Sequence, residues 1–170
     1  MSSNHQWLTR PEKPSDIDSV RRINLAAFET AEEADLVDAL RADPAWIEGL
    51  SMLSTGIDGA PIGYALLTRC HIGDAPALCL GPCAVPPEYQ RTGAGAAAVR
   101  AALSAATDHG EDFVVVLGHP AYYPRFGFGR ASLHGIRLSI DVPDEALMAL
   151  SLSGRPIPGG TVRYAAPFGI

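Results

Sequence analysis

Cysteine is scarce in this chain of 170 residues, with Cys70, Cys79 and Cys83 as its complete set. Their odd number, without a C-x-x-C pair or a histidine at ligand spacing, excludes a disulfide framework and predicts no zinc or other metal site. No stretch approaches the ~20 consecutive apolar residues that a membrane-spanning helix needs. The first residues also lack a basic segment followed by an apolar block, so we expect a cytoplasmic protein with reduced thiols.

Positive charge is scarce as well. The sequence has 13 basic residues, of which Lys13 is the single lysine, against 19 acidic residues, and its net charge is −6. A nucleic-acid-binding domain would carry a basic face, so this function class is disfavoured. Apolar residues make up 47% of the chain and charged residues 19%, which excludes a disordered protein. Because domains cluster near ~100–150 residues, we expect one domain over residues 1–170.

Helical and β-like patterns alternate along the chain. Residues 7–10 predict a short strand, Ser15 is a candidate N-cap of a helix that extends to about Phe28, and Glu32–Arg41 predicts a second helix. An Ala-rich helix is expected between Gly93 and the stop signal Gly110. Strands are predicted at 50–54, 62–68, 77–80 and 113–117, and more weakly at 136–140, 145–150 (or a helical turn) and 161–164.

This order of elements predicts a mixed α/β (α+β) fold. The short runs between residues 50 and 80 are separated by turn residues, as in a β-meander, and they form a mostly antiparallel central sheet. The continuous apolar run at 113–117 is typical of a strand that is buried on both faces. Helices flank this sheet, and a C-terminal β extension is expected over about 136–170.

The segment from Leu80 to Gly95 has the composition of an anion site. An apolar strand leads through a Pro-rich turn into a helix whose first residues include Gly93 and Gly95. The first N–H groups of a helix have no intrahelical acceptor, and together with the helix dipole they favour a diphosphate. Glycine lacks the Cβ that would keep a phosphate away.

This segment has three interpretations. The first is a plain Gly-rich connection between a strand and a helix. The second is a dinucleotide-binding fingerprint, since residues 93–98 match G-x-G-x-x-A. The fingerprint fits poorly, because seven residues separate Val85 from Gly93 and the acids Glu111 and Asp112 precede the next strand instead of ending it. No Gly-Lys-Ser/Thr is present, so a Walker loop is excluded.

The third interpretation is a family resemblance. Ala84-Val85-x-Pro87-Glu88-Tyr89-Gln90-x-x-Gly93-x-Gly95 closely resembles the acetyl-CoA-binding motif of GCN5-related N-acetyltransferases (GNAT), Gln/Arg-x-x-Gly-x-Gly/Ala. Residues 122–128, Tyr-Tyr-Pro-Arg-Phe-Gly-Phe, are similar to the Tyr-x-x-x-Gly-Phe ending of that fold. Residues 10–16, 36–41 and 117–123 further resemble the YhbS-like branch of predicted acetyltransferases, so the resemblance covers nearly the whole chain.

The resemblance implies an N-acetyltransferase that transfers the acetyl group of acetyl-CoA to a primary amine by direct nucleophilic attack. The backbone N–H of Cys83 would polarise the thioester carbonyl, and Tyr123 would be the general acid for the CoA thiolate. Backbone N–H groups from Arg91 to Ala96 would hold the pyrophosphate, and the strand edge at 83–85 the pantetheine. The implied cofactor-binding residues are Cys83, Ala84, Val85, Gln90, Arg91, Thr92, Gly93, Ala94, Gly95, Ala96 and Tyr123.

Two parts of this site depart from the family pattern. Pro124 disfavours helical geometry at Tyr123, so Tyr122 is the alternative acid. The glutamates that relatives use as a base are also missing: Cys79 stands at one position, and valines occupy the strand that carries the other. Glu33 is therefore taken as the candidate base. Glu32, His119 and a chain of water molecules remain open.

The distribution of acidic and basic residues along the chain bears on the kind of amine that accepts the acetyl group. Residues 15–60 contain ten acids and three arginines, an excess of seven acids, whereas residues 81–130 contain four of each. If the first two helices border the acceptor, this field favours a cationic amine. The alternative function is a CoA- or acetyl-CoA-binding sensor or interaction module without turnover. The sequence also leaves open whether the protein forms a homodimer.

Overall fold

The structure is a computed structural model, and it describes residues 6–170. Its strands and helices, in chain order, are β1 (Leu8–Pro11), α1 (Ile17–Ala27), α2 (Glu32–Arg41), β2 (Trp46–Thr55), β3 (Pro61–Ile72), β4 (Ala75–Ala84), α3 (Ala94–Asp108), β5 (Phe113–Leu117), β6 (Gly129–Arg130), β7 (Ile136–Arg137), β8 (Leu147–Ser151) and β9 (Gly160–Arg163). The sheet order is β1-β2-β3-β4-β5-β8-β6, and β9 pairs with β3 and β7. Most of these pairs are antiparallel, which confirms the expected fold class.

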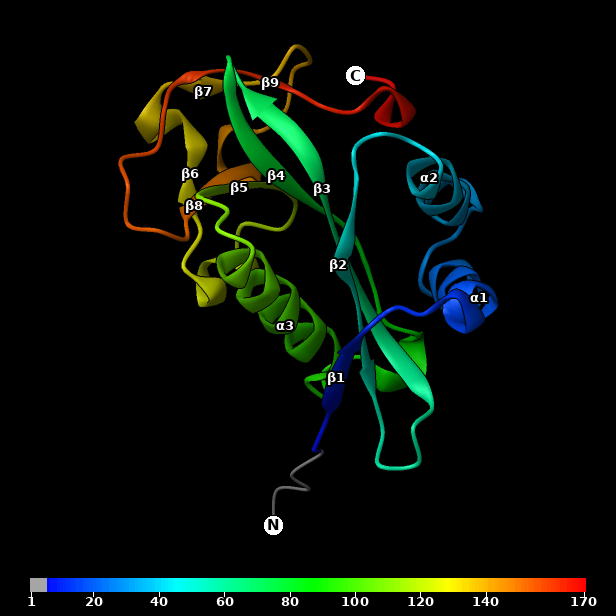
Figure 1. Ribbon diagram of the computed structural model, residues 1–170. Coiled ribbons are helices and arrows are strands. Elements are labelled where there is room, and N and C mark those ends of the chain that lie inside the picture. The colour runs from blue at the N-terminus through cyan, green and yellow to red at the C-terminus, as the bar shows by residue number, and fades with distance from the viewer. Residues whose placement is uncertain (1–5) are drawn as a thin grey trace.

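Helices cover both faces of the sheet (Figure 1): α3 lies on one face, and α1 and α2 lie on the other. The alternation of side chains along β3 explains this arrangement. Ala65 and Leu67 pack in the cluster that includes α3, whereas Tyr64 and Leu66 pack with α1 and α2. Because both faces are covered, β3 is apolar on both sides and does not alternate between apolar and polar residues.

The C-terminal part of the chain completes the sheet and its second face. β8 pairs with β5 over its full length, and residues from 131 to 168 pack on the side chains of Cys79 and Val115, on the face away from α3. The strand predicted near 161–164 and the strand alternative at 145–150 are confirmed as β9 and β8. The weak pattern at 136–140 forms a strand at Ile136–Arg137.

Most predicted elements lie where the pattern placed them, and one detail is wrong. The second helix and the strand at 113–117 have the expected bounds, and the meander strands are longer than expected. Ser15 is not the N-cap of α1, because residues 14–16 form a 3₁₀ turn and the helix begins at Ile17. The carboxylate of Asp16 accepts hydrogen bonds from the N–H of Lys13 (2.7 Å) and from Arg10 (2.9 Å), and this fixes the turn.

Within residues 6–170, no helix is both long enough and apolar enough to cross a membrane.

Candidate active site

A cleft opens where β4 and β5 separate. The two strands are parallel and connected through α3, and their pairing ends at Leu80 with Val116. The pairing of β4 with β3 continues to Ala84 with Tyr64. Within residues 6–170, no strand therefore pairs with residues 81–84 of β4 on the side of β5. An unpaired strand edge offers backbone donors and acceptors to an extended ligand.

A bulge in β4 stands at the start of this free edge. Leu67 pairs with Leu80 and Ala65 with Cys83, so β4 contains one residue more than β3 between these pairs. The extra length falls at Gly81 and Pro82, and Gly81 has a φ of +144°, which favours glycine. A bulge turns the backbone away from regular pairing. Here it directs the strand end at Cys83 along the cleft.

The N-terminus of α3 faces the same cleft. Gly93 is the N-cap residue with a φ of +91°, and the first intrahelical hydrogen bond is donated by Ala97 to the carbonyl of Gly93 (2.9 Å). The N–H groups of Ala94, Gly95 and Ala96 therefore lie ahead of the helical hydrogen-bond ladder. Gly93 and Gly95 line the cleft together with the preceding turn. This geometry is suited to a diphosphate.

Two close contacts require glycine around this helix start. A Cβ on Gly95 would stand 2.8 Å from Cγ2 of Val85, so a side chain there would force the helix away from the strand end. A Cβ on Gly63 of β3 would stand 2.6 Å from the carbonyl oxygen of Ala94. The same carbonyl accepts a hydrogen bond from Ser54 Oγ (2.7 Å). The start of α3 is thus fixed against β2, β3 and the end of β4.

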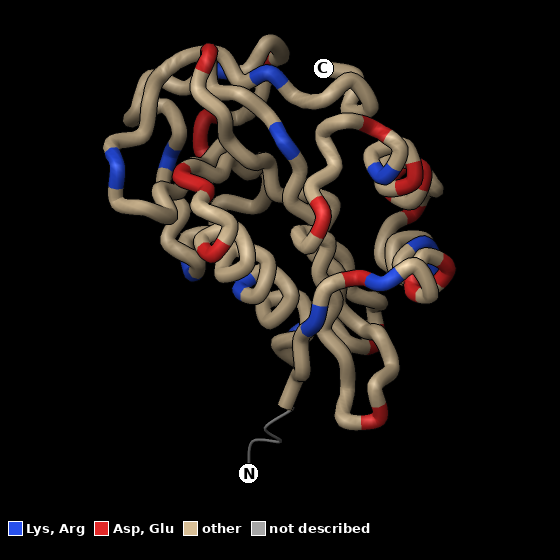
Figure 2. Tube along the Cα trace, in the orientation of Figure 1, with Lys and Arg blue, Asp and Glu red and all other residues tan. Residues whose placement is uncertain are grey.

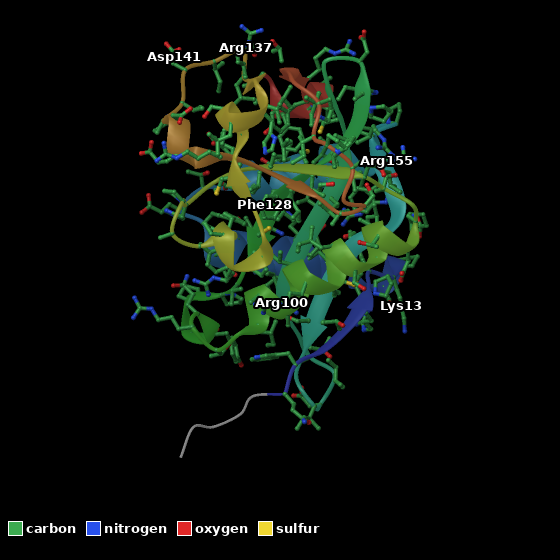
Figure 3. All side chains as sticks on the ribbon, turned by 90° about the vertical axis from the view of Figure 1, so that its left-hand side faces the viewer. Lys13, Arg100, Phe128, Arg137, Asp141 and Arg155 are labelled. Atoms are coloured by element: carbon green, nitrogen blue, oxygen red, sulfur yellow. The ribbon has the colours of Figure 1, made fainter. Side chains whose placement is uncertain are left out.

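Aromatic rings form the opposite wall of the cleft. Tyr122 and Tyr123 both line it, and their rings meet edge to face with centroids 5.1 Å apart. Tyr123 also contacts Phe126 and Phe128. Arg100 of α3, labelled with Phe128 in Figure 3, lies over the ring of Phe126 at 5.1 Å. These contacts fix the tyrosines between α3 and β5.

The expectation that Pro124 disfavours helical geometry at Tyr123 is wrong. Residues 123–126 form a 3₁₀ turn that begins at Tyr123, and Pro124 is its second residue. Proline is tolerated in the first turn of a helix because the N–H that it lacks would have no helical acceptor there. Tyr123 therefore enters the cleft on a short helical turn.

Burial keeps three hydrogen-bonding groups of the cleft neutral. It raises the pKa of Tyr123 above its usual range and the pKa of the Cys83 thiol to about 12. Burial also raises the pKa of Tyr122. All three groups hold their protons at neutral pH, so each can donate a hydrogen bond.

The cleft has a positive character although the chain is acidic. Its volume is about 550 Å³. Arg91 and Arg125 line it together with His119, and no acidic side chain among the described residues does. Arg91 has a φ of +65°, and the guanidinium of Arg125 stacks over Tyr122 at 4.3 Å. Acids are gathered instead on α2, which carries Glu32, Glu33, Asp35 and Asp38 (Figure 2).

The structure brings most of the expected cofactor-binding residues to this cleft. Thr92 and Ala94 do not line it: the carbonyl of Thr92 accepts a hydrogen bond from Trp7, and Ala94 is buried. The residues that do line it are Cys83, Ala84, Val85, Gln90, Arg91, Gly93, Gly95, Ala96 and Tyr123.

The three candidate bases are placed differently. His119 lines the cleft beside the tyrosines, whereas Glu32 and Glu33 in the first turn of α2 do not. Glu33 Oε2 is buried and has no hydrogen-bond partner among the described residues. Ala27 and Phe28, at the end of α1, form the cleft wall on this side.

Several site residues carried no signal in the sequence. Trp7 and Phe28 reach the site beside residues that are distant in the chain, and Gly118 meets the ring of Tyr123 across the turn after β5. No spacing rule reports such contacts. No cluster of metal-ligating side chains occurs within residues 6–170.

Known proteins resemble this chain over nearly its full length. Residues 17–128 match the family model described as "Acetyltransferase (GNAT) family". The chain is 35% identical to "Uncharacterized N-acetyltransferase YjhQ" of Escherichia coli K12, over 96% of this chain and 94% of that protein. It is 31% identical to "Uncharacterized N-acetyltransferase YhbS" of the same strain, over 95% and 98% of the two chains.

Solved structures agree with this similarity. The crystal structure of YhbS from Escherichia coli in complex with CoA has a TM-score of 0.87 and 27% identity, and the match covers 100% of this chain and 96% of that chain. A GNAT family acetyltransferase from Brucella melitensis, solved in complex with acetyl-CoA, has a TM-score of 0.79 and 30% identity over 96% of this chain and 99% of that chain.

Proposed function

This chain belongs to the GNAT family of acetyltransferases, and we propose that it transfers the acetyl group of acetyl-CoA to a primary amine. The observation that carries the proposal is the cleft itself, in which a free strand edge, a helix N-terminus and a neutral tyrosine meet. Relatives that align over almost the whole chain were solved with CoA and with acetyl-CoA. A single sheet with strands from residue 8 to residue 163 supports one acetyltransferase domain.

Acetyl-CoA binding uses the backbone for its anionic part. The pyrophosphate accepts hydrogen bonds from N–H groups of residues 91–96, and the pantetheine lies along the β4 edge at Cys83, Ala84 and Val85. Arg91 and Arg125 add positive charge near the mouth of the cleft. Because α3 is anchored to β2, the donors are fixed before the ligand arrives.

The reaction needs three events at the thioester. The amine nitrogen forms a bond to the carbonyl carbon, and the Cys83 N–H stabilises the negative charge that develops on the carbonyl oxygen. The C–S bond then breaks, and the electron pair leaves with the sulfur. Tyr123 donates its proton to this thiolate, so the products are the N-acetyl amine and CoA thiol. The amine releases one proton, which balances the proton that Tyr123 recovers from solvent.

His119 takes the proton of an acceptor that arrives as an ammonium ion, directly or through water, with Glu33 as the alternative. His119 is favoured because it lines the cleft. Removing a general base costs ~10²–10⁴-fold in rate. We expect His119→Gln to lower kcat by about 100-fold and Glu33→Gln to leave it within about twofold, and the reverse order would assign the base to Glu33.

The acceptor is an amine whose positive charge matches the acidic helix α2, which carries Glu32, Glu33, Asp35 and Asp38 (Figure 2). Part of this acidity is neutralised within the pair of helices, because Arg21 pairs with Asp35 and Asp38. Glu29 and Glu32 lie near the connection between the helices and are exposed. A polyamine therefore should be a better acceptor than a neutral or acidic amine of similar size.

The test combines ligand binding with turnover. At 100 times Kd, a ligand stabilises the fold by about 2.7 kcal/mol, which corresponds to roughly 5–10 °C in Tm for a chain of this size. We expect CoA and acetyl-CoA to raise Tm by this amount, and acetyl-CoA to release thiol with at least one amine of a panel of alkylamines, polyamines and peptides with a free N-terminus or lysine. Stabilisation without thiol release from any acceptor would favour the sensor module, and no stabilisation by either ligand would contradict CoA binding.

A further inference from the structure

Tyr122 presents a hydroxyl group that the proposed reaction leaves unused. A Cβ on Gly95, the second residue of α3, would stand 3.6 Å from this hydroxyl oxygen, so the hydroxyl lies over the start of the helix. Among the described residues the hydroxyl has no hydrogen-bond partner. Burial raises the pKa of Tyr122, and the group is therefore a donor at neutral pH. A side-chain donor thus lies across the cleft from the backbone N–H groups of α3.

Arg125 is held by Tyr122 at two points. Its guanidinium stacks on the ring of Tyr122 at 4.3 Å, and its Nε donates a hydrogen bond to the backbone carbonyl of the same residue (2.8 Å). The two terminal amino groups of the guanidinium remain for a ligand. Arg125 lines the cleft, and within residues 6–170 it forms no ion pair. The arginines that do form ion pairs there lie outside the cleft, and they are Arg10, Arg21, Arg41, Arg69, Arg130, Arg155 and Arg163.

Packing fixes the ring of Tyr122 in this place. The rings of Tyr123 and Phe126 meet it edge to face, with centroids 5.1 Å and 5.4 Å away. The backbone N–H of Tyr122 donates a hydrogen bond to the carbonyl of His119 (3.1 Å). Arg100 of α3 lies over Phe126 and so connects this packing to the helix. The hydroxyl and the stacked guanidinium therefore need little reordering when a ligand binds, which favours affinity.

We propose that Tyr122 and Arg125 form a clamp that holds the pyrophosphate of CoA from the side opposite α3. The hydroxyl donates to one phosphate oxygen, and the terminal N–H groups of the guanidinium donate to oxygens beside it. The bound group is the pyrophosphate rather than the 3′-phosphate, because the hydroxyl lies over the helix start at Gly95. This assignment rests on the proposed function, and it gives Tyr122 a binding role that is separate from the proton transfer by Tyr123.

The first test compares CoA with two fragments that lack phosphates. Dephospho-CoA lacks the 3′-phosphate and keeps the pyrophosphate, whereas pantetheine has no phosphate. In Arg125→Met, we expect the Kd for CoA and for dephospho-CoA to rise by the same factor, about tenfold at low salt, because a hydrogen bond to a charged group is lost. The Kd for pantetheine, measured by displacement of CoA, should not change. A loss with CoA that is absent with dephospho-CoA would overturn the assignment to the pyrophosphate, and an equal loss with pantetheine would overturn the phosphate contact.

Arg137→Met is the matched control for this variant. Arg137, labelled in Figure 3, is exposed like Arg125, has no ion pair among the described residues, and lies on β7 outside the cleft. Both variants remove one positive charge, so they change the net charge of the protein equally. We expect the Kd for CoA to rise in Arg125→Met and to stay unchanged in Arg137→Met. An equal rise in both variants would attribute the effect to net charge and overturn the clamp.

Variants of Tyr122 separate the hydroxyl from the ring that supports Arg125. Tyr122→Phe keeps the ring and removes the donor, so the Kd for CoA should rise about fivefold, and the loss should appear in the KM for acetyl-CoA rather than in kcat. A loss in kcat at unchanged affinity would overturn the binding role. Tyr122→Leu removes the ring as well, and in this background Arg125→Met should cost less than about threefold in affinity. A full tenfold cost there would contradict the support of Arg125 by the ring.

The affinities are measured without an acceptor, which separates the clamp from the proposed acetyl transfer. A wild-type protein that binds CoA and acetylates no amine would contradict the transfer and leave the clamp in place. Equal affinities for CoA in the wild type and in Arg125→Met would overturn the clamp and leave the transfer in place.

Discussion

The indole Nε1 of Trp7 donates a hydrogen bond to the carbonyl oxygen of Thr92, with a separation of 2.9 Å. Trp7 lies just before β1, and Thr92 lies in the turn that leads into α3. The ring of Trp7 also meets Tyr89 edge to face, and its Cδ1 would lie 3.7 Å from a Cβ on Gly93. The segment before β1 therefore holds the turn whose N–H groups bind the pyrophosphate in the proposed complex.

Loss of this anchor should weaken CoA binding. Trp7→Phe keeps an aromatic ring beside Tyr89 and removes the donor to Thr92. A neutral hydrogen bond contributes about 1 kcal/mol, so we expect the Kd for CoA, measured by titration calorimetry, to rise about fivefold. Leu8→Ala, at an exposed neighbouring position, is the control and should have no effect. An affinity within twofold of wild type in Trp7→Phe would mean that the anchor does not shape the site.

Charge at Gly93 should control phosphate binding. Gly93→Asp and Gly93→Asn place side chains of equal size at the same left-handed backbone position, which asparagine tolerates. A Cβ there would meet the ring of Trp7 at 3.7 Å, an ordinary van der Waals contact, in both variants. We expect the Asp variant to bind CoA at least tenfold more weakly than the Asn variant, because a carboxylate would face the pyrophosphate. The difference should shrink in high salt. Equal affinities at low salt would contradict a pyrophosphate at this helix start.

The activity should persist at alkaline pH. A general acid works in its protonated form, and the pKa of Tyr123 is raised by burial above the usual value of about 10 for tyrosine. The protonated fraction therefore stays near one up to about pH 10, and the Cys83 thiol, with a pKa of about 12, does not titrate in this range. We expect kcat to reach a plateau without an alkaline decline below about pH 10. A decline with a midpoint near pH 8 would exclude Tyr123 as the acid.

Asp16 should make the stability of the folded state depend on pH in the acid range. The hydrogen bond from Arg10, together with the N–H of Lys13, holds the pKa of Asp16 below its usual value. A lowered pKa in the folded state contributes stability that is complete above the unfolded value of about 3.9 and is lost as the pH falls through the folded value.

At pH 7, Asp16→Asn should therefore cost about 2 kcal/mol, or roughly 4–8 °C in Tm. The difference from wild type should close as the pH falls through the lowered pKa of Asp16 in the folded state. Asp18→Asn, at an exposed position in α1, is the control and should change Tm by less than about 1 °C. A Tm gap between Asp16→Asn and wild type that does not depend on pH would contradict the ion pair.

The fold was predictable because its signals are local. The bounds of α2 and β5 follow from apolar spacing and from the residues that end them, and the turns at Gly59 and Gly73 have the left-handed backbone that glycine favours. The start of α1 was not predictable from the sequence, since Asp16 is fixed by Arg10 from the preceding strand rather than by a capping pattern. The longer β2 and β3 reflect pairing with neighbouring strands, which extends a strand beyond its apolar run.

The site was predictable only where its residues are close together in the sequence. The segment 83–96 carries its geometry in a continuous motif, so its glycines and strand end could be identified as one unit. The space for the ring of Tyr123 could not be predicted, because Gly118 meets this ring only through the turn after β5. The choice among the bases also depends on the cleft wall, which Ala27, Phe28 and His119 form from separate elements.

The most direct test of the account is a single-turnover quench with acetyl-labelled acetyl-CoA and an accepted amine. We expect the label to pass from acetyl-CoA to the amine without appearing on the protein, because attack is direct and the Cys83 thiol stays protonated. Tyr123→Phe should lower this rate by about 100-fold with near-normal CoA affinity. Labelled protein that forms and decays at the rate of product formation, with the label on Cys83, would contradict direct transfer.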